Sequence, residues 1–215
     1  MSRPETPPIA VESAPVRWSR WWVASGALFL LTALLAAYRS LPGTLDGGVL
    51  SALSVATSAG FGLALIAAAI AGVRHPSVGL RRSAIVALSL LAIWIVAGPP
   101  LLLAVFGVSS SAPVFIDAIV KIALSGVIVA GFTRSTLPDP WRYTPAAVLA
   151  AVVLASLMEF FLLSGAVTDM NAIVLVANVL LLTRIVATGV LGAVALRAAR
   201  SRADSVVMLG GRADA

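Results

Sequence analysis

The chain has no cysteine, a single histidine and a single lysine, and charged residues make up only 11% of its 215 residues. Without cysteine it has no disulfide, no cysteine-bound zinc or iron–sulfur cluster and no thiol nucleophile. Intramembrane haem and copper sites also draw on histidine, cysteine or methionine. His75 lies in a predicted loop, and Met158 is the only methionine within a predicted span. The sequence therefore predicts no metal site and no cofactor.

The short motifs of common catalytic sites are absent as well. The chain contains no HExxH, no GxSxG and no Walker sequence, which are the signatures of zinc peptidases, serine hydrolases and nucleotide-binding loops. We identify no catalytic residue and do not expect an enzyme. An intramembrane enzyme that relies on Asp, Glu, Lys and Arg alone is the alternative that this composition leaves open.

Apolar residues dominate what is present: 60% of the chain is hydrophobic, and its mean hydropathy is +1.04. This composition is far more apolar than that of a soluble domain. A spanning helix needs about 20 apolar residues, so the chain has room for about six spans and for no separate soluble domain. We expect an all-α integral membrane protein, a bundle of six transmembrane helices.

Six apolar runs separated by short polar or turn-rich links define the predicted spans. They cover residues 21–38, 50–73, 83–106, 113–132, 144–163 and 172–196. Residues 1–16 are rich in proline and predict a disordered cytoplasmic tail, residues 17–198 form the transmembrane domain, and residues 199–215 form a second cytoplasmic tail. Trp18, Trp21 and Trp22 are expected at the membrane interface, where aromatic rings are enriched.

The basic residues predict the orientation of the spans. Twelve arginines fall on the side that holds both tails and only Arg39 on the other, while Lys121 and Arg184 lie within spans. Because basic residues gather on the cytoplasmic side, both termini should be cytoplasmic and the protein should lie in the cell membrane. Topology thus explains the net charge of +6, and no nucleic-acid partner is expected.

Five polar or ionisable residues fall inside the predicted spans. They are Asp117 and Lys121 in the fourth span, Glu159 in the fifth, and Asn178 and Arg184 in the sixth. A charge at the bilayer centre costs at least about 2.5 to 3.5 kcal/mol, so such residues usually face a partner or a water-filled cavity. At a rise of about 1.5 Å per residue, the five are expected to converge in the outer half of the membrane.

The spacing of these residues predicts how they pair. Asp117 and Lys121 are four residues apart with the acid first, so their side chains should meet on one helix face. Ser125 extends the same polar stripe by one turn. Glu159 is expected to find its counter-charge across helices, in Lys121 or in Arg184.

The third predicted span contains a helix break at Gly98, Pro99 and Pro100. Proline donates no helical hydrogen bond and clashes with the carbonyl four residues earlier, so the carbonyls of Ile95 and Val96 should lose their partners. A neighbouring helix, water or a ligand must then satisfy these carbonyls. A broken helix beside charged residues is typical of carrier binding sites near the midplane.

Two other features of these spans predict packing rather than binding. The second span has small residues four apart, at Ala56 and Gly60 and at Ser58 and Gly62, which allow two helix backbones to approach closely. Trp94, isolated in the third span, is expected to pack or to contact lipid.

Two functions remain open at this point. The first is a transport or solute-binding component that uses the intramembrane charges to bind a small polar solute or an ion. The alternative is a non-catalytic membrane subunit whose buried charges pair structurally or with the helices of a partner. The expected partners are accordingly the lipid bilayer, such a solute, and a membrane protein or a second copy of the chain.

Overall fold

The computed structural model describes residues 19–40, 46–74, 78–107, 112–163 and 170–200. These residues form six helices joined by short links, and no strand occurs among them, which confirms the all-α prediction. The helices are α1 (Arg20–Arg39), α2 (Gly47–Arg74), α3 (Arg82–Phe106), α4 (Ala112–Phe132), α5 (Thr144–Leu163) and α6 (Met170–Arg200). Every helix end lies within four residues of the predicted span. Residues 1–16 and 201–215 of the predicted tails lie outside the described ranges.

Five of the helices are long and apolar enough to cross a membrane: α1, α2, α3, α4 and α6. In α5 the apolar stretch that the structure describes fully, Thr144–Leu154, is shorter. The outer surface is itself apolar, with Leu34 and Val55 each 67% exposed. A water-soluble monomer rarely exposes so much contiguous apolar surface, so these helices are those of a membrane-embedded protein.

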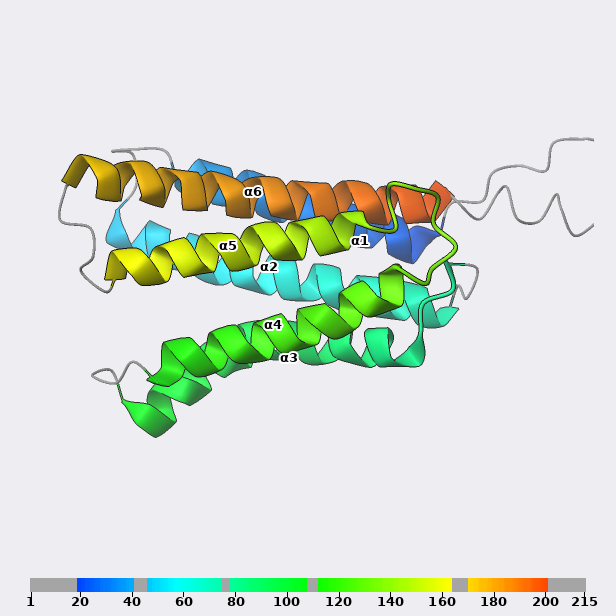
Figure 1. The fold of residues 1–215 in the computed structure, drawn as a ribbon, viewed down its shortest axis with the longest axis horizontal. Helices are drawn as coiled ribbons and strands as arrows, with labels where there is room; N and C mark the ends of the chain where they lie inside the picture. The colour runs from blue at the N-terminus through cyan, green and yellow to red at the C-terminus, as the bar shows by residue number, and fades with distance from the viewer. Residues whose placement is uncertain (1–18, 41–45, 75–77, 108–111, 164–169, 201–215) are drawn as a thin grey trace, which may run out of the picture.

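The helices form a closed ring in chain order. Each helix contacts the next, and α6 returns to contact α1. The contact between α4 and α5 is the least extensive of the six. Figure 1 shows the helices running along the long axis, with the start of α1 and the end of α6 at the same end of the bundle. The ring encloses an interior to which all six helices contribute side chains.

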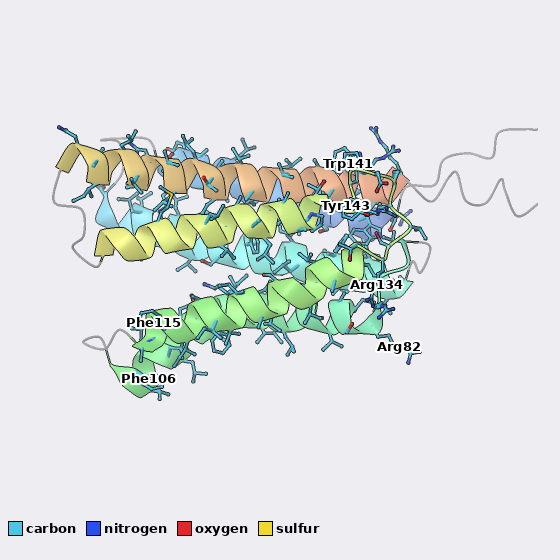
Figure 2. The ribbon with its side chains drawn as sticks, in the orientation of Figure 1. Arg82, Phe106, Phe115, Arg134, Trp141 and Tyr143 are labelled. Carbon is cyan, nitrogen blue, oxygen red and sulfur yellow. The ribbon has the colours of Figure 1, made fainter. Side chains whose placement is uncertain are left out.

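One end of the bundle is rich in arginine. Figure 2 shows Arg82, Arg134, Trp141 and Tyr143 at this end and Phe106 and Phe115 at the other. We call it the arginine-rich end; it carries Arg20, Arg74, Arg81, Arg82, Arg134, Arg142, Arg197 and Arg200. The opposite end of the described chain carries Arg39 alone.

Helices α1 and α2 approach each other closely, as the small residues of α2 predict. A Cβ atom added at Gly60 would lie 2.7 Å from Oγ1 of Thr32 on α1. The Ser25 hydroxyl of α1 donates a hydrogen bond of 2.9 Å to the Ala64 carbonyl of α2. Such a close approach maximises van der Waals contact where lipid supplies no hydrophobic drive between helices.

Trp22, the third residue of α1, points into the ring, and its predicted place at the membrane interface stays a prediction. Its side chain is only 1% exposed and belongs to the core of the ring, together with Ala195 and Ala198 of α6. The alanines leave room for a large indole between α1 and α6. Trp21 instead lies under the Arg74 guanidinium, 5.3 Å from the ring centroid, a cation–π contact.

The predicted break in the third span does not occur. Helix α3 continues through Gly98, Pro99 and Pro100 as far as Phe106. The fixed φ angle of proline is compatible with helical geometry, and the price is the loss of two backbone hydrogen bonds. The candidate site therefore contains no unwound segment. The carbonyls of Ile95 and Val96 still receive no helical hydrogen bond from Pro99 and Pro100.

Candidate functional site

Asp117 and Lys121 form the ion pair that their spacing predicts. Lys121 Nζ lies 2.6 Å from Asp117 Oδ2, one turn apart on α4. The two side chains are half-buried, with 24% of Asp117 and 40% of Lys121 exposed. Lys121 lies near the middle of α4 and Asp117 one turn closer to its start, where a charged group requires a nearby opposite charge.

Trp94 is part of this arrangement, although the sequence-based interpretation assigned it to packing or lipid contact. Its indole Nε1 on α3 donates a hydrogen bond of 3.0 Å to Asp117 Oδ1 on α4. Both carboxylate oxygens of Asp117 are thus engaged, one by Trp94 and one by Lys121. We call these three residues the Trp94–Asp117–Lys121 group.

Gly98 makes room for the indole of Trp94. A Cβ atom at position 98 would lie 2.7 Å and 2.8 Å from two carbons of the Trp94 ring. The absence of a side chain lets the ring lie against the backbone of its own helix, one turn along. Gly98 therefore supports the site by placing the indole rather than by breaking the helix.

Lys121 also lines a cavity of about 220 Å³ in the middle of the ring. All six helices contribute to its wall, and four aromatic residues stand in it: Trp22, Phe29, Phe61 and Phe132. On α4 the wall runs from Lys121 to Phe132, that is, from mid-helix toward the arginine-rich end. The sequence-based expectation placed the polar site in the outer half, whereas this cavity extends into the half that contains the arginine-rich end.

The polar groups of the wall are few: the Lys121 ammonium and the Trp22 indole only donate, and the Ser25 and Ser125 hydroxyls can donate and accept. Ser25 already donates to the Ala64 carbonyl. Lys121 carries three N–H donors, and among the described residues its only hydrogen-bond acceptor is Asp117. Within the same ranges the Ser125 hydroxyl has no hydrogen-bond partner, and the buried Nε1 of Trp22 has none either.

Comparison with protein-family models, with curated proteins and with solved structures finds no match to this chain. No ligand or partner is therefore assigned by similarity.

Two of the three remaining predicted site residues do not line the cavity, and the side chain of the third is outside the described residues. Asn178 and Arg184 are on exposed positions of α6 and do not line the cavity. The side chain of Glu159 lies outside the described residues, so its predicted counter-charge stays a prediction. The structure thus joins Asp117 and Lys121 beside the cavity, whereas Asn178 and Arg184 are exposed on α6 and are not among the residues that line it.

Proposed function

We propose that this protein is a membrane-embedded solute-binding component, of the kind used in transport, whose binding site is the cavity that begins at Lys121. One observation carries the proposal. An ammonium group in the middle of a helix lines a cavity to which all six helices contribute wall residues, while Asp117 balances its charge. Ligand sites typically combine an apolar concavity with a few well-placed polar groups.

We further propose six membrane spans with both termini on the cytoplasmic side of the cell membrane. The 20 residues of α5 give a length of about 30 Å, which matches the hydrocarbon core of a bilayer. The arginine-rich end, where α1 begins and α6 ends, is favoured on the cytoplasmic side by the positive-inside rule.

The accessibility of the cavity tests the binding function. Because the chain has no cysteine, a single Ser125→Cys variant carries one reactive thiol in the cavity wall. We expect N-ethylmaleimide to modify this thiol in the folded protein much faster than it modifies Ala87→Cys, whose site on α3 is 3% exposed and does not line the cavity. Equal, slow modification of both variants would overturn the binding function.

A second candidate function rests on the outer surface of α6. Asn178 occupies an exposed position within the apolar run of this helix, where a partner helix would shield a polar group from lipid. A non-catalytic subunit of a larger complex, or a homo-oligomer, would cover this face. Purification in a mild detergent tests this function. A protein that co-purifies in a fixed ratio with the wild type and is lost from the Asn178→Leu variant would support the subunit function. A wild-type protein that is a monomer, and stays one in the Asn178→Leu variant, would contradict it.

A further inference from the structure

The wall of the cavity excludes strongly polar solutes. The residues that line it are aromatic or aliphatic apart from Ser25, Lys121 and Ser125. A hydrated ion or a sugar would have to give up its water for a surface that offers almost no compensating hydrogen bonds, which is costly. The body of the ligand must therefore be apolar.

The charge balance of the site disfavours a ligand whose polar head is charged. Lys121 and Asp117 already neutralise each other at 2.6 Å, and Trp94 engages the remaining oxygen of Asp117. An anion or a cation brought into this site would add one uncompensated charge at mid-helix, where charge is expensive. A neutral head leaves the pair balanced.

The free donors indicate what the neutral head must contain. Only one of the three N–H groups of Lys121 is used within the described residues. Independently, the cavity-lining Trp22, 1% exposed, carries a buried Nε1 for which those residues supply no acceptor. Buried donors of native proteins normally find an acceptor, so a ligand oxygen beside Lys121 would use a donor that is otherwise unused there, and the Trp22 donor near the start of α1 is separate from it.

The volume sets the size of the ligand. A cavity of about 150 Å³ binds benzene, so a cavity of about 220 Å³ accommodates roughly nine non-hydrogen atoms on the same scale. Such a molecule dissolves in lipid and can reach the cavity between helices. The α4–α5 seam, where contact is sparsest, is the natural route.

Together these observations identify a ligand class. Building on the binding function proposed above, we infer that the cavity takes a neutral, largely apolar molecule of roughly nine non-hydrogen atoms whose single hydroxyl or carbonyl oxygen accepts a hydrogen bond from Lys121. Asp117 balances the charge of the ammonium and holds it in place, and Trp94 orients the Asp117 carboxylate, so both act as positioning residues.

Four small probes of matched shape test this class: 2-phenylethanol, propylbenzene, phenylacetate and 2-phenylethylammonium. The first has a neutral acceptor, the second has no acceptor, and the last two carry opposite charges. The measured quantity is the rise in the thermal unfolding midpoint of the protein in lipid nanodiscs as each probe is titrated. We expect 2-phenylethanol to bind about tenfold more tightly than each of the other three, as one charge-assisted hydrogen bond would provide.

A pair of valine variants locates the binding. Val129→Phe fills part of the cavity wall on α4, whereas Val127→Phe enlarges an outward-facing residue, 41% exposed, on the same helix. We expect 2-phenylethanol to lose its effect on Val129→Phe and to keep it on Val127→Phe. Loss in both variants, or in neither, would overturn binding in this cavity.

The outcomes separate the ligand class from the binding function. Stronger binding of phenylacetate or of 2-phenylethylammonium overturns the neutral class and leaves the binding function standing. Equal binding of propylbenzene and 2-phenylethanol overturns the role of Lys121. Stabilisation by none of the four overturns the class, and the reactivity of Ser125→Cys then decides whether the binding function falls with it.

Discussion

The indole of Trp94 on α3 donates a 3.0 Å hydrogen bond to the same Asp117 carboxylate that Lys121 holds on α4. This bond joins two helices whose remaining surfaces are mostly apolar. Since both oxygens of Asp117 are engaged, the carboxylate has a defined orientation, and the ammonium of Lys121 is held where it borders the cavity. The positions of these three side chains underlie the first predictions.

Replacing Trp94 with phenylalanine should weaken the α3–α4 contact. The Trp94→Phe variant keeps an aromatic ring but loses the donor to Asp117, so we expect a loss of about 1 kcal/mol in the free energy of unfolding. Unfolding in a lipid–detergent mixture measures it. Trp141→Phe is the control, because the Trp141 indole has no hydrogen bond within the described residues; an equal loss in both variants would argue against the bond.

Gly98→Ala should displace the indole ring of the Trp94–Asp117–Lys121 group. The added methyl would meet the Trp94 ring at 2.7 Å, and overpacking of this kind typically costs about 1 to 3 kcal/mol. Gly126→Ala on α4 is the matched control, since no atom lies within 4 Å of the added Cβ and alanine favours helix over glycine by about 1 kcal/mol. We expect the thermal unfolding midpoint to fall for Gly98→Ala and to rise for Gly126→Ala. A Gly98→Ala variant as stable as Gly126→Ala would show that the ring is not confined there.

Neutralising Asp117 alone should be worse than neutralising the pair. Asp117→Asn leaves Lys121 without its counter-charge at mid-helix, so we expect a loss of about 2.5 kcal/mol of stability. The double variant Asp117→Asn with Lys121→Met leaves no unpaired ion and should recover most of it. A double variant less stable than Asp117→Asn would contradict this electrostatic account of the pair.

The proposed orientation predicts a labelling pattern in intact cells. Ser40 follows the end of α1, opposite the arginine-rich end, and Thr136 lies in the link between α4 and α5 at the arginine-rich end; both are exposed. A membrane-impermeant maleimide should modify Ser40→Cys directly and Thr136→Cys only after permeabilisation. The reverse pattern would invert the topology, and labelling of both from outside would refute the six-span arrangement.

The helices and their ends could be predicted because long apolar runs with polar links leave few alternatives in a bilayer. The Asp117–Lys121 pair could be predicted too, since residues four apart on a helix meet whatever surrounds them. Both predictions depend on local geometry, which is encoded in the spacing of residues along a single helix.

The rotation of each helix about its axis could not be predicted. A helix that is apolar on all sides carries little information about which face points inward, so the contact of Trp94 with Asp117 and the exposed positions of Asn178 and Arg184 were missed. The burial of Trp22 was not predicted for the same reason, because its position near the start of α1 does not say that its side chain points into the core. The continuity of α3 through Pro99 and Pro100 likewise depends on packing beyond the span itself.

The measurement that tests the binding role of Lys121 and Asp117 most directly is the effect of 2-phenylethanol on the double variant Asp117→Asn with Lys121→Met in lipid nanodiscs. If the pair serves a ligand, this variant unfolds near the wild-type temperature, and 2-phenylethanol no longer raises that temperature. If the variant unfolds much earlier and 2-phenylethanol still stabilises it as strongly as the wild type, the pair is structural, which would contradict its role in binding.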